Sequence, residues 1–72
     1  MRRYQVYSYG ERESFDQKDE GKFDDFDEAV SRARSTVYRG RRMAHVMRIA
    51  GPLNGDILYV YDQDEHEYRT IH

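Results

Sequence analysis

One segment of the chain has the apolar spacing of an amphipathic helix, and it is the only such segment. Its apolar residues recur three or four positions apart along a single stripe, Phe26, Ala29, Val30, Ala33 and Val37. This spacing places them on one face of an α-helix. A lone helix has to bury that face against another layer, so the remainder of the chain must supply a sheet.

Polar residues mark both ends of this helix, which is predicted over residues 26–39. Asp25 is expected as the N-cap, because its carboxylate can accept from free amides of the first turn. Glu28 stands three residues later and can return the bond as in a capping box. Gly40 is expected to end the helix in a left-handed conformation.

Strands are predicted on either side of the helix, where tyrosine and β-branched residues alternate with polar ones. The expected strands cover residues 3–9, 43–50, 57–62 and 66–71. Glycine, proline and asparagine between residues 51 and 56 predict a turn, and residues 62–65 a second, polar one. Residues 10–22 predict a long and mobile loop, with room for a short strand near residues 14–16. The predicted fold class is α+β, a single two-layer βαβββ domain over residues 1–72 in which one helix packs on a three- to four-stranded antiparallel or mixed sheet.

Composition narrows the class of protein further. The chain has 72 residues and no cysteine, which excludes disulfides and cysteine-based metal sites. A domain this small without disulfides is expected in the cytoplasm. The two N-terminal arginines precede no apolar stretch, so no signal peptide is expected, and no apolar run approaches the ~20 residues that span a bilayer.

Strand alternation predicts which side chains the helix covers. Arg48 is an unfavourable residue to place beneath a helix, so its face of the strand is assigned to the outside. The core predicted on this basis consists of Val6, Phe26, Ala29, Val30, Ala33, Val37, Met47, Ile49, Leu58 and Val60.

The opposite sheet face is predicted to be open and rich in tyrosine. Its predicted partner-binding residues are Tyr7, Tyr9, Val46, Arg48, Tyr59 and Tyr61, with Ile57 beside them. Tyrosine and arginine are favoured where an interface must be apolar and still tolerate water. We therefore expect a non-enzymatic protein-interaction module that self-associates, for instance as a homodimer, or docks on another protein through this face. The alternative is that tyrosine, a good strand former, simply lines a solvated sheet.

A block of arginines supports a nucleic-acid alternative. Residues 29–50 contain six arginines and no acid, whereas acids predominate on either side. Binding of single-stranded RNA or DNA would use the same tyrosines and the residues Arg32, Arg39, Arg41, Arg42 and Arg48. The overall charge of −2 and the pairing of Arg32 with Glu28, one helical turn away, oppose this alternative.

Two other sets of residues invite a chemical role and are assigned none. The turn from Asp62 to Glu67 offers oxygen ligands and His66, but it lacks the glycine and the spaced bidentate acid of a calcium loop. His45 stands mid-strand without a nucleophile motif to pair with it. The sequence therefore predicts no catalytic residue, no metal, no cofactor and no small-molecule substrate.

Overall fold

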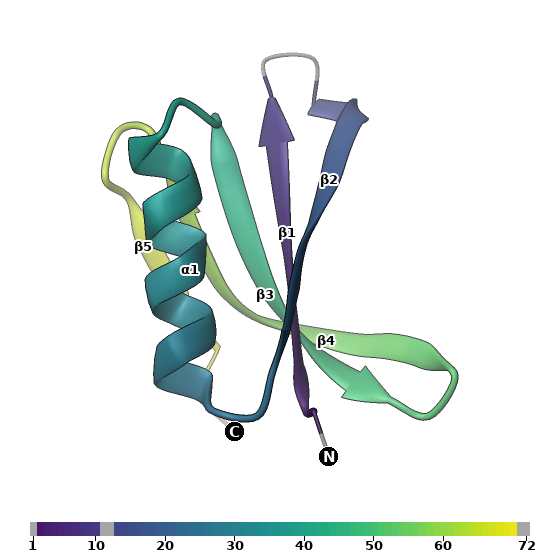
Figure 1. Cartoon of the computed structure of the whole chain (residues 1–72). Helices are drawn as coiled ribbons and strands as arrows, with labels where there is room; N and C mark the ends of the chain where they lie inside the picture. The colour runs from purple at the N-terminus through teal and green to yellow at the C-terminus, as the bar shows by residue number, and fades with distance from the viewer. Residues whose placement is uncertain (1, 11–12, 71–72) are drawn as a thin grey trace.

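The chain forms two layers, an antiparallel sheet and one helix packed on a single face of it (Figure 1). The computed structural model describes residues 2–10 and 13–70. In chain order the elements are β1 (Tyr4–Gly10), β2 (Glu13–Phe23), α1 (Phe26–Tyr38), β3 (Met43–Ala50), β4 (Leu53–Asp62) and β5 (Glu67–Arg69). The sheet order is β2-β1-β3-β4-β5, and every neighbouring pair is antiparallel. The α+β class and the single helix on an antiparallel sheet are confirmed.

Helix α1 lies where the apolar stripe predicts it, and its C-terminus closes as expected. Gly40 has φ 115°, and its amide donates to the carbonyl of Val37, while the amide of Arg41 donates to that of Thr36. These two bonds form a Schellman motif, which uses carbonyls that the helix itself leaves free. The predicted cap at the other end is wrong in detail, because the Asp25 side chain makes no capping hydrogen bond. No helix within the described part of the chain has the length and apolar character needed to cross a membrane.

The predicted loop over residues 10–22 is wrong, since most of this segment forms strand β2. Residues 11 and 12 lie outside the described residues. β2 pairs with the outer edge of β1 from Gln17 to Phe23 and contains an irregularity beside Gly21, whose φ is 117°. The side chains of β2 are mostly charged, so the segment lacks the alternation of apolar and polar residues that predicts a strand. Charged residues are nevertheless common in edge strands, where they discourage pairing with other chains.

The sheet is also wider and more regular than expected. It contains five strands, not three to four, and none is parallel. A tight turn at Gly51 and Pro52 joins β3 to β4, so β4 begins at residue 53 and not at 57. β5 is shorter than predicted, and residue 71 lies outside the described residues. In Figure 1 the β3–β4 hairpin extends past the end of the sheet that α1 covers.

The core beneath α1 contains side chains that were assigned to the open face. Val46, Tyr59 and Tyr61 are 0%, 1% and 3% exposed and form one cluster with the helix. The members of that cluster are Val6, Ala29, Val30, Ala33, Val37, Ala44, Val46, Tyr59 and Tyr61, with Tyr4, Phe23 and Phe26 packed against it. The core prediction is thus right for Val6, for the helix and for Leu58, which is buried outside this cluster, and it is wrong for Met47, Ile49 and Val60, which are only partly buried.

The error has one physical cause, the position of Arg48 along β3. Arg48 does share a strand face with Val46, but it is exposed because it lies on the part of β3 near the projecting hairpin. A helix of thirteen residues covers about 20 Å, so it cannot cover the whole face of a long strand. One strand face is therefore buried at Ala44 and Val46 and open at Arg48.

Candidate interaction surface

The sheet has a second face, opposite α1, on which the described residues place no other layer. The cross-strand set Tyr7–His45–Val60 lies on this side, because Val6, Val46 and Tyr59 alternate with these residues and pack under the helix. Met47 alternates with Val46 in the same way, and a register shift in β4 pairs it with Ile57. We call this surface the uncovered face and define it by Tyr7, Tyr9, Met43, His45, Met47, Ile49, Ile57 and Val60. Three neighbouring strands, β1, β3 and β4, contribute to it.

The side chains of the uncovered face are partly withdrawn from water even without a covering layer. All are half-buried except Ile57, which is 41% exposed. The Tyr9 and His45 rings lie 4.7 Å apart between centroids. Burial lowers the pKa of His45, and burial, followed by the neighbouring Tyr7, raises the pKa of Tyr9. Both rings are consequently neutral near pH 7, and no member of this surface has a formal charge there.

Polar groups border the uncovered face on the β2 side. Gln5 of β1 lies on this side of the sheet between Met47 of β3 and Lys22 of β2. It is buried, and its Nε2 donates to Oδ1 of Asp19 at 2.6 Å and to the carbonyl of Gly21 at 3.0 Å. The same Asp19 oxygen accepts the amide of Gly21 at 2.8 Å. This carboxylate is therefore held at the irregularity of β2, at the edge of the surface and not within it.

The predicted partner-binding residues divide between the two sides of the sheet. Tyr7 and Tyr9 lie on the uncovered face, as expected. Val46, Tyr59 and Tyr61 do not, because they are buried beneath α1. Arg48 is exposed, but it shares the strand face of Val46 and is directed away from the surface that Tyr7 occupies.

The sequence interpretation missed Met43, His45, Met47, Ile49 and Val60 as members of this surface. All five lie within strands that the sequence predicts, so the error concerns which side of the sheet they occupy and not their secondary structure. One usable signal was present, since Ala44 and Val46 are small enough to lie directly beneath a helix that packs through Ala29 and Ala33.

The buried tyrosines instead connect α1 to β5. The Tyr59 hydroxyl donates to Oε2 of Glu67 at 2.6 Å, and the Tyr61 hydroxyl lies 3.0 Å from that of Tyr38. The hydrogen bond from Tyr59 lowers the pKa of Glu67, and burial, followed by the bond to Glu67, raises the pKa of Tyr59. Arg34 lies over the Tyr61 ring at 5.2 Å from its centroid. These phenols have an apolar body in the core and a polar tip at its edge.

The arginine block does not gather on one surface. Arg32 and Arg39 line an open groove beside Phe23 on the outer side of α1, and Arg48 lies with Arg3 near the projecting hairpin. Arg41 lines a second hollow with Arg39 and Lys18. Its guanidinium also bonds within the chain, because its Nε donates to Ser8 at 2.9 Å and its Nη1 pairs with Asp16 at 3.2 Å. Arg42 lines a third site with the Asp62 turn. Arg32, Arg39 and Arg41 thus neighbour one another beside α1, whereas Arg42 and Arg48 lie on other parts of the fold.

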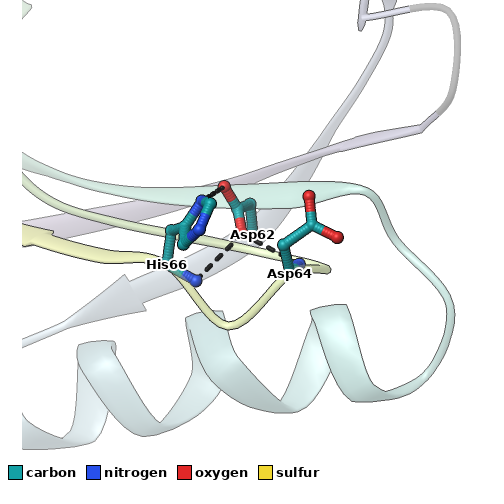
Figure 2. Close-up of side chains that lie close together, drawn as sticks. All are labelled: Asp62, Asp64 and His66. Carbon is teal, nitrogen blue, oxygen red and sulfur yellow. Dashed lines mark hydrogen bonds and ion pairs between the residues drawn. The ribbon is translucent and has the colours of Figure 1, made fainter.

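The turn between β4 and β5 brings three potential metal ligands together (Figure 2). One ligand atom from each of Asp62, Asp64 and His66 lies within 4.8 Å of the others. Oδ1 of Asp62 accepts the amides of Asp64 and His66 at 2.9 and 3.0 Å, and Oδ2 lies 3.4 Å from the His66 imidazole. The backbone bonds account for the clustering, since an aspartate that closes a turn in this way draws its neighbours inward. We therefore retain the interpretation of a polar turn.

Comparison of the chain with protein-family models, with curated proteins and with solved structures found no match.

Proposed function

We propose that this chain is a non-enzymatic protein-interaction module and that its uncovered face is the binding surface. The observation that carries the proposal is the position of one continuous, uncharged set of side chains on the side of the sheet that α1 leaves open. A contiguous apolar surface of this kind on a small domain typically marks an interaction site. Tyrosine, methionine and isoleucine supply its contact area.

The chemistry of this surface favours a protein partner over a small molecule or a nucleic acid. A sheet face is broad and offers contact area, whereas small-molecule sites are concave and enclose their ligand. The charge that phosphates require lies elsewhere, on Arg32 and Arg39 at the outer side of α1 and on Arg48 at the hairpin. Nucleic-acid binding therefore stays a second prediction, for which the tyrosines and the arginines would have to act from different sides of the fold.

Site-specific photo-crosslinking tests this proposal in living cells. A photoreactive benzoylphenylalanine replaces Tyr9 on the uncovered face or, as the matched control, the 64%-exposed Tyr38 on α1. We expect protein adducts from position 9 and few from position 38, because only the former is on the binding surface. The mass of the adduct distinguishes a second copy of the chain from another protein.

Two results would contradict the proposal. Equal labelling from both positions would mean that the uncovered face has no special role. Adducts that contain RNA or DNA, released by nuclease and not by protease, would favour the nucleic-acid alternative.

A further inference from the structure

We infer that the occupant of the uncovered face is a second copy of this chain, packed sheet against sheet around a twofold axis. This inference rests on the proposed function and names its partner. The two sheets would lie about 10 Å apart, as in a β-sandwich. A symmetric dimer of this kind brings the same surface of each subunit together, so that surface has to be complementary to its own copy in shape and charge.

The charge distribution meets this requirement of self-complementarity. The side chains of β1, β3 and β4 at the middle of the uncovered face have no formal charge at neutral pH, and the charged Asp19 and Lys22 of β2 and Asp62 of β4 lie outside them, so two copies bring no like charges together at their centre. The carboxylates of Asp19 and Asp62 lie at its borders, and both are held by hydrogen bonds within their own chain. Across a twofold axis the uncharged centre of one copy therefore meets the uncharged centre of the other, and no unpaired charge is buried between them.

The size of the molecule is consistent with a stable dimer. Its principal extents are 30 × 23 × 18 Å. The two longer extents limit any face of the molecule to roughly 700 Å² in outline, so a dimer through this face would lie at the lower end of the ~800 Å² per partner of a standard interface. The described residues place no layer on the side of the sheet opposite α1, so pairing would give each copy the covering layer that a sheet face normally has.

The strand order determines which residues meet at the axis. β3 is the middle strand of five, so a twofold axis through the centre of the sheet places β3 of one copy against β3 of the other. The side chains of β3 on this face are Met43, His45, Met47 and Ile49. His45 and Met47 lie at the middle of that row and therefore closest to the axis.

This placement makes the dimer sensitive to acid through the two copies of His45. Within one chain His45 faces Tyr7 and Tyr9 from β1 and Val60 from β4, and the second copy adds its own His45. None of these groups offers a negative charge at neutral pH, and the nearest carboxylates, Asp19 and Asp62, are at the borders. Protonation of both imidazoles, as the pH falls through the lowered pKa of His45, would place two positive charges in an enclosed apolar site. The dimer is thus expected at neutral pH and the monomer in acid.

Analytical ultracentrifugation of the purified chain tests the inference. Between about 1 µM and 1 mM at pH 7.5 we expect a species of twice the 8.7 kDa chain mass. Met47→Glu and, as a second variant, Ile49→Lys should each raise the dimer dissociation constant at least about 100-fold, because each buries an unpaired charge. Ser31→Glu, on the exposed side of α1, is the matched control and should leave the constant unchanged. Circular dichroism establishes that each variant is folded.

The pH dependence is measured with the same samples. From about pH 7.5 to pH 5 the dissociation constant of the wild type should rise at least about tenfold. His45→Gln should remove most of this dependence, while His66→Gln, in the turn after β4, should retain it.

The possible failures of the two proposals are distinguishable. If the chain is monomeric at the highest concentration, the inference that a second copy occupies the uncovered face is wrong. It is also wrong if the chain dimerises but neither Met47→Glu nor Ile49→Lys weakens the dimer. If the chain is monomeric and position 9 nevertheless crosslinks to a different protein in cells, the proposed function stands without the dimer. If it is monomeric and position 9 gives no adduct, both proposals fail. A constant that does not change with pH would overturn the placement of His45 at the axis.

Discussion

At the scale of the residue, Gly10 leaves room for an ion pair formed by two distant parts of the chain. A Cβ at this position would lie 1.8 Å from Oδ2 of Asp16 and 3.3 Å from Nη1 of Arg41. These two side chains pair with each other at 3.2 Å, and Arg41 also donates to the Asp16 carbonyl. Any side chain at position 10 would displace the Asp16 carboxylate and break the pair.

Gly10→Ala is therefore expected to lower the free energy of unfolding by about 1 kcal/mol, the contribution of a half-exposed ion pair and its hydrogen bonds. Urea denaturation measures this change. The same substitution in an Asp16→Ala background should be neutral or stabilising, because a glycine within a strand is itself unfavourable. Equal losses in both backgrounds would show that Gly10 has another role.

Val46 and Met47 are adjacent on β3 and occupy opposite sides of the sheet. Val46 is 0% exposed beneath the helix, whereas Met47 belongs to the uncovered face. Val46→Ala should lower the free energy of unfolding by roughly 1–3 kcal/mol through the cavity it leaves. Val46→Lys should abolish folding, while Met47→Lys should still give a folded protein with a native circular dichroism spectrum. If instead Met47→Lys abolished folding and Val46→Lys did not, Met47 would lie beneath the helix and Val46 on the open face, as the sequence predicts.

At the scale of the element, β5 is too short to be held by its ladder alone. It comprises only Glu67–Arg69 and pairs with β4 on one side, at the edge of the sheet. The Tyr59–Glu67 hydrogen bond and Arg69, which lies 5.0 Å over the Tyr59 ring, attach it to the core. We infer that this contact determines whether β5 stays on the sheet.

Tyr59→Phe should accordingly loosen β5 without unfolding the domain. Amide hydrogen exchange of residues 67–69 should become roughly 3- to 10-fold faster, while the exchange of β3 changes little. Tyr68→Phe is the control, because Tyr68 is 59% exposed and points to the other side of β5. The wild-type contact should also be sensitive to acid. The pKa of Glu67 is lowered in the folded state, so its contribution is present above the unfolded value and is lost as the pH falls through the lowered pKa.

Strand β2 covers the edge of β1, although its sequence has no apolar alternation that would predict a strand. Without β2, β1 would expose its outer row of backbone groups. The pairing is made by backbone hydrogen bonds, which do not require apolar side chains, and Gln5 and Ser8 reinforce it through Asp19 and Glu20. Polar cross-strand bonds of this kind leave no periodic apolar pattern, so the segment was predicted as a loop.

At the scale of the whole molecule, one helix is too small to cover both faces, or even one entire face, of five strands. Its length limits the covered area to the region of Ala44 and Val46 and leaves the β3–β4 hairpin and the opposite face without a layer. The uncovered face thus exists because a single helix of thirteen residues packs on a sheet of five strands. The proposed dimer would supply the layer that a second helix supplies in larger α/β folds.

Local patterns in the sequence were sufficient to determine α1, its glycine end, strands β1 and β3 and the α+β class, because each depends on contacts between residues close in the chain. Periodicity also identified Tyr7 and Tyr9 as members of an open sheet face. Only the tertiary structure decided that β2 is a strand, that Val46, Tyr59 and Tyr61 lie beneath the helix, and that His45 and Met47 lie on the other side. The alternation of a strand defines two faces but does not say which one a helix will cover. That choice depends on the length and position of α1 relative to Arg48, and these are properties of the assembled fold.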